Sequence, residues 1–244
     1  MKLKDAFDSR LKGGMIKHDH FFPIYDQHLS DLQRRSNLKV LEIGVYNGGS
    51  LYMWKNFLPN SQIVGIDIDP YCEQWADPSN NVRVYRGDQC DTSLLQRVCE
   101  LEGPFDLIID DGGHENNQII TSLEFLFPHL NNNGWYVVED TFAAYQPNHS
   151  CDRTRGTNGE ELNPILKDFD PQKTSMEFLK SLADKLNAWA YRAPEAEHLR
   201  VEGEWDEYEK NLYSMHFYDS IVFIQKKSRD TEDCFGKSVW YTFK

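Results

Sequence analysis

Short apolar runs alternate with helical patterns along the first 141 residues of the chain. Runs that end at turn-forming or acidic residues, as buried strands do, lie at 38–45, 63–68, 82–85, 105–110 and 135–140. After the first run, Leu51, Trp54 and Phe57 recur at the spacing of one helix face, which we expect to belong to the core. Strands that alternate with helices predict an α/β fold of the Rossmann-like, doubly wound type, with a mostly parallel sheet covered on both faces.

Two further helices are expected before the fourth and the fifth strand. Asp91 is a suitable N-cap for a helix whose apolar stripe consists of Leu94, Leu95, Val98 and Leu101. A second stripe consists of Ile119, Ile120, Leu123, Leu126, Phe127 and Leu130, and a turn is expected at 131–134.

The pattern changes after residue 141. Residues 145–171 are polar and rich in proline, asparagine and glycine, which is typical of a long loop or lid. Residues 176–191 predict an amphipathic helix, while 195–210 fit either a solvated helix or an ordered loop. The runs 212–217 and 220–225 are joined by a short connection and predict an antiparallel hairpin at the end of the sheet.

Composition narrows the range of partners. The net charge of −13 repels phosphate backbones, so neither nucleic acid nor an anionic membrane is an expected partner. The five cysteines form no C-x-x-C pair, which argues against a disulfide scaffold and a cysteine-based zinc site. Neither a signal peptide nor a membrane span is apparent, and a cytoplasmic protein is expected.

The strand ends carry acidic residues, and ligands of open α/β sheets bind at these ends. The first turn, EIGVYNGGS from Glu42 to Ser50, lacks the G-x-G-x-x-G pattern of pyrophosphate binding. Carboxylates at Glu42, at Asp67 near the ribose hydroxyls and at Asp88 near the adenine amine would suit the cation S-adenosylmethionine. A tight turn that binds no ligand is the alternative.

A second acidic group follows the fourth and fifth strands. Neighbouring strands lie about 4.8 Å apart, so Asp110 and Asp111 would stand beside Glu139 and Asp140. Four carboxylates this close require either protonation or a bound cation. Hard oxygen ligands without a nearby cysteine point to Mg²⁺, Mn²⁺ or Ca²⁺.

Taken together, these motifs resemble one enzyme family. The segments KVLEIGVYNGGSLYMW, IVGIDIDP, GDQCD, FDLIIDDGGH and LFPHLNNNGWYVVEDTFAAY are similar to class I S-adenosylmethionine-dependent methyltransferases. More narrowly, they resemble the macrolide-sugar and rhamnosyl O-methyltransferases, which are related to cephalosporin-hydroxylase-type sequences. The resemblance implies a seven-stranded sheet with an antiparallel last strand.

The resemblance also implies a single methyltransferase domain over residues 1–244. Its expected parts are an N-terminal cap segment at 1–36, a cofactor- and metal-binding core at 37–141, an active-site loop at 145–171, and a C-terminal helix and hairpin at 172–244. The expected activity is Mg²⁺-dependent transfer of a methyl group from S-adenosylmethionine to a sugar hydroxyl of a glycoside or glycan.

Residue roles follow by the same resemblance. Asp111, Glu139 and Asp140 would bind the metal, and His114 would be the general base beside Asp111. A metal lowers the pKa of a coordinated hydroxyl, so that an imidazole can accept the proton near neutral pH. The expected cofactor-binding residues are Glu42, Gly44, Tyr46, Gly48, Ser50, Asp67, Asp69, Asp88, Gln89 and Asp110.

Several alternatives stay open at this point. Asp111 or Asn116 could only cap the following helix, His114 could be a surface histidine, and Asp110 could bond a backbone amide. The protein could act on a phenol, as catechol O-methyltransferases do, or bind S-adenosylmethionine without catalysis. His18 and His20 lie in a segment that resembles the family's cofactor-covering entry. The sequence does not identify the acceptor, and a homo-oligomer is compatible with it.

Overall fold

A mixed seven-stranded sheet forms the centre of the protein. The computed structural model describes residues 1–7, 13–146, 172–188 and 204–228. In the sheet order β3-β2-β1-β4-β5-β7-β6, the strands are β1 (Lys39–Ile43), β2 (Gln62–Asp67), β3 (Val82–Arg86), β4 (Phe105–Asp110), β5 (Leu130–Val138), β6 (Leu212–Tyr218) and β7 (Ile221–Lys226). Strands β1 to β5 pair in parallel, and β7 runs antiparallel to both β5 and β6. The expected fold class and the antiparallel hairpin are confirmed.

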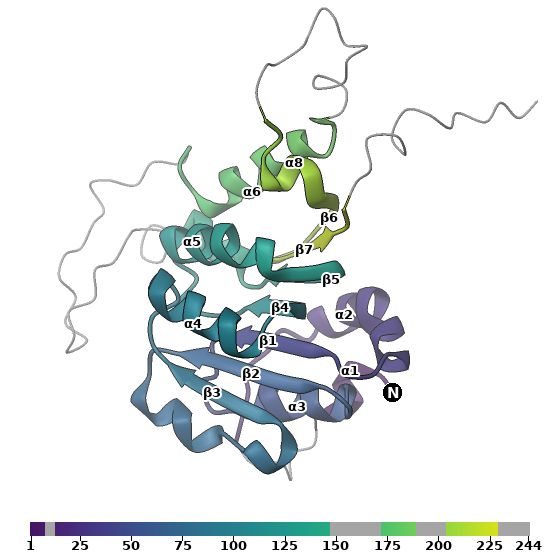
Figure 1. Cartoon of the computed structure of the whole chain (residues 1–244), viewed down its shortest axis with the longest axis vertical. Coiled ribbons are helices and arrows are strands. Elements are labelled where there is room, and N and C mark those ends of the chain that lie inside the picture. The colour runs from purple at the N-terminus through teal and green to yellow at the C-terminus, as the bar shows by residue number, and fades with distance from the viewer. Residues whose placement is uncertain (8–12, 147–171, 189–203, 229–244) are drawn as a thin grey trace, which may run out of the picture.

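Helices cover the sheet on both faces (Figure 1). The α-helices are α1 (Leu3–Ala6), α2 (Phe21–Leu29), α3 (Gly49–Phe57), α4 (Thr92–Glu102), α5 (Asn116–Leu126), α6 (Ser175–Lys185) and α8 (Glu207–Asn211). Short 3-10 helices are η1 (Ser30–Arg34), η2 (Pro70–Trp75), η3 (Pro78–Asn80), η4 (Phe127–His129) and η5 (Thr141–Tyr145). In the described part of the chain, no helix combines the length and the apolar character that crossing a bilayer requires.

Alternate residues of each central strand enter two separate cores. In β4, Leu107 and Ile109 pack with α1, α2 and α3, whereas Ile108 packs with α4, α5 and α6. This period of two explains why Leu107, Ile108 and Ile109 at the centre of β4 are all apolar, since both faces of the strand are buried. The predicted core position of Trp54 and Phe57 is confirmed, with 0% and 1% of each residue exposed.

The predicted element boundaries hold in some places and fail in others. Asp91 caps α4, because its side chain accepts hydrogen bonds from the backbone N–H groups of Ser93 and Leu94. The prediction that Leu101 belongs to the buried apolar stripe of this helix is wrong, because Leu101 is 61% exposed. Strand β5 begins at Leu130 and includes the turn expected at 131–134.

The C-terminal predictions are tested only where the chain is described. The helix expected at 176–191 is α6, which ends at Lys185, and helix α8 accounts for the end of the ambiguous stretch 195–210. Apart from Tyr145 and Gln146, the expected loop 145–171 lies outside the described residues, as do 189–191 and 195–203.

One buried carboxylate at the end of α4 gives a test of the fold. Glu102 is 2% exposed, accepts two hydrogen bonds from Arg83 Nη1 at 2.7 and 2.8 Å, and also bonds Tyr85 and Gln62. Burial alone would raise the pKa of Glu102, but these hydrogen bonds outweigh it and lower the pKa. The ionised group therefore stabilises the fold above its unfolded pKa of about 4.3, and this stabilisation is lost as the pH falls through the lower folded-state pKa.

We expect Glu102→Gln to lower the free energy of unfolding by about 1 to 2 kcal/mol at pH 7. The difference from the unaltered protein should shrink on acidification below about pH 4, where Glu102 is increasingly protonated. Urea unfolding at pH 7 and at a pH below about 4 measures this difference in the free energy of unfolding. Glu124→Gln, on the exposed side of α5, is the control and should change little at either pH. A loss for Glu102→Gln that is equal at both pH values would contradict the assigned role of the charge.

Candidate functional site

Two parallel strands deliver the acidic residues to one edge of the sheet. Strand β4 ends at Asp110, which is in register with Val138 at the end of β5. The segment that follows β4 contains Asp111, and the segment that follows β5 contains Glu139 and Asp140. The backbone N–H of Glu139 donates to the carbonyl of Asp110 at 2.9 Å. This pairing keeps the two acidic segments side by side, as the sequence predicts.

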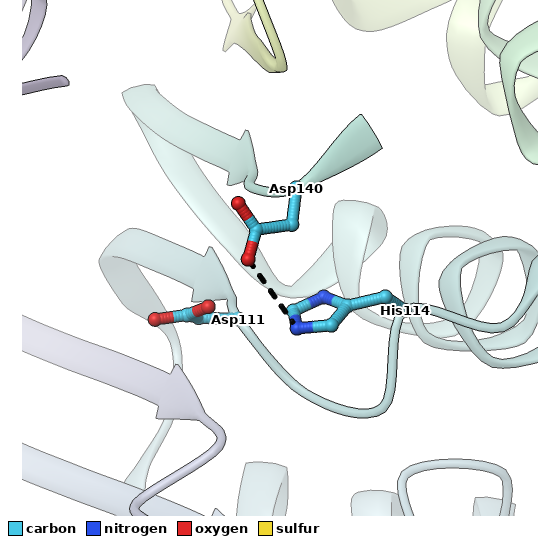
Figure 2. A group of neighbouring side chains, drawn as sticks. All are labelled: Asp111, His114 and Asp140. Atoms are coloured by element: carbon cyan, nitrogen blue, oxygen red, sulfur yellow. Dashed lines mark ion pairs between the residues drawn. The ribbon is translucent and has the colours of Figure 1, made fainter. Parts of the chain in front are cut away.

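Asp111, His114 and Asp140 converge in front of these strand ends. Each offers one ligand atom, and the three atoms lie within 4.8 Å of one another. Figure 2 shows the His114 ring directed at Asp140, and His114 Nε2 lies 3.6 Å from Asp140 Oδ2. His18 Nε2 lies 3.5 Å from the other oxygen, Oδ1. Asp140 Oδ1 accepts no hydrogen bond from any described residue.

Two of these residues have left-handed backbone conformations. The φ angle is +59° at His114 and +52° at Asp140, a region that non-glycine residues adopt rarely and often at functional sites. The helix after β4, α5, is capped by Glu115, which occupies its N-cap position, and not by Asp111 or Asn116. The alternative that Asp111 or Asn116 only caps this helix therefore does not hold.

Glu139 is not one of the three converging residues and is buried, with 2% exposed. Its two carboxylate oxygens lie 2.5 and 2.6 Å from the ammonium of Lys17, and one of them also accepts a hydrogen bond from Tyr25. Lys17 also donates to Asp111 Oδ2 at 3.2 Å. Glu139 was expected beside Asp111 and Asp140 as a metal ligand. In the structure it stands next to both, but its oxygens are held by residues of the N-terminal segment.

Burial controls the ionisation of this region. Loss of water contact raises the pKa of Asp111, Glu139 and Glu42 to about 7, and the ammonium of Lys17 opposes the rise in each case. Burial alone would lower the pKa of Lys17, but the charges of Asp111, Glu139 and Glu42 outweigh it, and the pKa is raised. Lys17 therefore remains cationic at neutral pH and offsets part of the buried negative charge.

A cavity of about 480 Å³ opens beside the group, at the C-terminal ends of β1, β2, β3 and β4. Asp111 belongs both to the convergent group and to the lining of this cavity. The other expected site residues that line it are Gly44, Tyr46, Asp67, Asp69, Asp88 and Gln89. No lysine or arginine is among the described residues of the lining, so the cavity rim is acidic.

Four expected cofactor residues do not line the cavity: Glu42, Gly48, Ser50 and Asp110. The carboxylate of Glu42 is fully buried and accepts hydrogen bonds from Ser50 Oγ at 2.8 Å and Trp54 Nε1 at 3.0 Å. Glu42 thus anchors helix α3 to strand β1. This inward hydrogen bonding is the physical reason why Glu42 and Ser50 do not face the cavity.

Asp110 also faces inward. It is 1% exposed and accepts hydrogen bonds from Gln89 Nε2 at 3.1 Å, from Tyr136 at 3.2 Å and from Ser122. Burial raises its pKa, while these hydrogen bonds oppose the rise. Asp110 was expected to face the cofactor or a backbone amide. Its observed partners are side chains, and it supports the cavity through Gln89.

Asp67 shapes the first turn from the neighbouring strand. Its Oδ2 accepts hydrogen bonds from the backbone N–H groups of Val45 and Tyr46 at 2.8 and 2.7 Å, and its Oδ1 accepts one from Asp69 at 2.9 Å. The carboxylate lines the cavity with lone pairs to spare, since each oxygen can accept a second hydrogen bond.

Residues 41–141 match the family model described as a methyltransferase domain. The chain contains a methyltransferase domain. Mycinamicin VI 2''-O-methyltransferase of Micromonospora griseorubida is 36% identical over 224 residues, which cover 86% of this chain and 49% of that protein. Demethylmacrocin O-methyltransferase of Streptomyces fradiae is 35% identical over 213 residues, 84% of this chain and 48% of that protein.

A solved structure agrees with these relatives. The methyltransferase MycE of mycinamycin biosynthesis, solved in complex with Mg, SAH and mycinamycin VI, superposes with a TM-score of 0.70 at 31% identity, covering 92% of this chain and 52% of that one. The expected resemblance to macrolide-sugar O-methyltransferases is therefore confirmed. The chain spans about half the length of the curated relatives it matches.

Lys17 and Tyr25 are two residues of the candidate site that the sequence did not reveal. Lys17 lies 122 positions and Tyr25 114 positions from Glu139 in the sequence. No local sequence pattern predicts contacts over such separations. The one available signal was electrostatic, because a cluster of four carboxylates requires a counter-charge. Lys17 supplies such a charge.

Gly44 gives a test of how the domain builds this site. Its φ angle is +94°, and a Cβ atom there would lie 1.9 Å from the carbonyl oxygen of Asp111. We expect Gly44→Ala to lower the free energy of unfolding by at least about 2 kcal/mol and to impair ligand binding in the cavity. Chemical unfolding measures the loss. The control is Gly14→Ala, where a Cβ would meet nothing within 4 Å; equal losses would contradict the argument.

Proposed function

We propose that this protein transfers a methyl group from S-adenosylmethionine to a hydroxyl group of a sugar-bearing small molecule, with the help of a divalent metal ion. The observation that carries the proposal is that Asp111 belongs to two neighbouring features of the site. It lines the cavity and also belongs to the group formed with His114 and Asp140. A cofactor in the cavity and a cation in the group would therefore be neighbours.

The cavity suits S-adenosylmethionine by its charge. The cofactor is a cation without phosphate, and the described lining contains Asp67, Asp69 and Asp88 but no basic side chain. We assign Asp67, at the end of β2, to the ribose hydroxyls and Asp88, after β3, to the adenine end. Gly44, Tyr46 and Gln89 complete the proposed contacts, as the sequence suggested.

The group in front of the cavity fits a divalent cation by its donor atoms. Carboxylate oxygens are the ligands that Mg²⁺ and Mn²⁺ prefer, and Asp140 Oδ1 has no hydrogen-bond donor in the described residues. We propose Asp111 and Asp140 as ligands, with Glu139 behind them as the third. When bound, such an ion lowers the pKa of a hydroxyl that it coordinates.

We assign His114 as the general base. Its side chain is 25% exposed and its Nε2 lies 3.6 Å from Asp140 Oδ2, so the ring is accessible from solution and oriented by a carboxylate. A hydroxyl placed between Asp140 and the cofactor would lie within reach of Nε2, which would accept its proton as the oxygen attacks the methyl group. Asp140 would then stabilise the resulting imidazolium.

The acceptor class comes from the relatives. Their names specify methylation of sugar hydroxyls on macrolides and on rhamnosyl tetracenomycins, and we propose a hydroxyl of a glycoside for this protein. The net charge of −13 would repel nucleic acid, in keeping with a neutral or cationic acceptor.

The metal requirement can be tested with a panel of macrolide glycosides. We expect methyl transfer in Mg²⁺ and at least a hundredfold slower transfer in EDTA, because the hydroxyl then keeps its ordinary pKa. Calorimetry should show S-adenosylmethionine binding under both conditions, since the cavity is separate from the metal ligands apart from Asp111. Full activity in EDTA would refute the metal requirement, and absence of cofactor binding would refute the whole proposal.

The role of the base can be tested by substitution. His114→Ala should lower kcat by about 10² to 10⁴-fold while leaving S-adenosylmethionine affinity near that of the unaltered protein, because His114 does not line the cavity. The matched control is His129→Ala; His129 lies in η4, directly before β5, and so at the opposite end of that strand from Glu139 and Asp140. An unchanged kcat for His114→Ala would remove this residue from the mechanism.

A further inference from the structure

Lys17 places an ammonium group inside the acidic cluster. Only 1% of its side chain is exposed, and its Nζ atom lies 2.5 and 2.6 Å from the two oxygens of Glu139 and 3.2 Å from Asp111 Oδ2. Glu139 and Asp111 are also two of the proposed metal ligands. The protein's own cation thus occupies oxygens that a divalent ion would need.

The backbone around Lys17 is fixed at several points. On one side, Gly14 donates to the carbonyl of Asn47 and accepts from the N–H of Gly49, both at 3.1 Å, so that the segment is attached to the first cofactor turn. On the other side, the carbonyl of His18 accepts from the N–H that begins α2 at 3.0 Å. These contacts hold the backbone on either side of Lys17 beside the site, and the ammonium itself is held by its bonds to Glu139 and Asp111.

Two cations would then share the same carboxylates. A divalent ion bound to Asp111 and Asp140 would lie near the Lys17 ammonium, with few water molecules between them to screen the repulsion. Without the metal, the same ammonium offsets charges that otherwise repel one another in a buried place. The presence of Lys17 therefore favours the metal-free state of the site relative to the metal-bound state.

We propose that Lys17 is the resident counter-cation of this site, a positioning residue that holds Glu139 and Asp111 in the absence of metal and competes with the metal for them. The inference rests on the proposed metal site. It predicts that metal affinity in this protein is held below what its carboxylates alone would give. It also predicts that the domain remains folded when metal is removed.

The test measures metal binding and stability without any methyl transfer. At pH 7.5, Lys17→Met should bind Mg²⁺ and Mn²⁺ at least tenfold more tightly than the unaltered protein in calorimetric titrations. Its Tm should fall in EDTA and recover in Mg²⁺, with a larger metal-induced rise than the unaltered protein shows, because tighter binding to the folded state stabilises it more. Lys4→Met removes an exposed ion pair with Asp19 and should leave both quantities unchanged.

The outcomes separate this inference from the proposed function. If the unaltered protein binds Mg²⁺ and Lys17→Met binds it no more tightly, or loses the same stability with and without metal, Lys17 is only structural and the inference fails alone. If neither protein binds Mg²⁺ or Mn²⁺, both the inference and the proposed metal site fail.

A second variant covers the case in which Lys17→Met does not fold. Replacing Lys17 by Met and Glu139 by Gln together removes one cation and one anion, so the net charge of the cluster is unchanged. We expect this double variant to fold in EDTA, because removing both partners of a buried ion pair leaves neither charge uncompensated. A double variant that is unfolded in EDTA would contradict the assigned pairing.

Discussion

Negative charge buried at the carboxyl edge of the sheet is the constraint on which the site depends. Glu42, Asp110 and Glu139 each expose 2% or less of their surface, and a buried carboxylate without partners is too costly to keep ionised. The fold provides a separate set of partners for each: hydroxyl, indole, amide and ammonium groups from α2, α3, α5, the loop between β3 and α4, and the N-terminal segment.

The same partners explain how a rigid cavity and a metal-binding group meet at one residue. Asp67 fixes the first turn through two backbone N–H groups, and Gln89 bridges Asp110 to the N–H of Gly113 at 3.0 Å. These bonds set the cavity walls before any ligand arrives, so that little ordering would remain on binding. Asp111 belongs both to the cavity lining and to the group that it forms with His114 and Asp140. Its position follows from the register of β4 and β5.

Sequence reasoning succeeded where periodicity or strand ends carry the information. The sheet, the Asp91 cap and the neighbouring acidic segments all follow from local patterns. It failed where a choice depends on distant partners: the inward direction of Glu42 depends on Trp54, and the ammonium beside Glu139 comes from Lys17, 122 positions away. Such contacts are set by packing of the whole chain, which a linear pattern does not encode.

The two adjacent aspartates after β4 show how the fold separates roles within one motif. Successive side chains of a strand point to opposite faces, so Asp110 enters the side of the sheet that holds Ser122 of α5 and Tyr136 of β5. Asp111 emerges on the other side, toward Lys17. Two carboxylates next to each other in sequence therefore do not share one cation. The first stabilises the wall of the cavity, and the second lines the cavity itself.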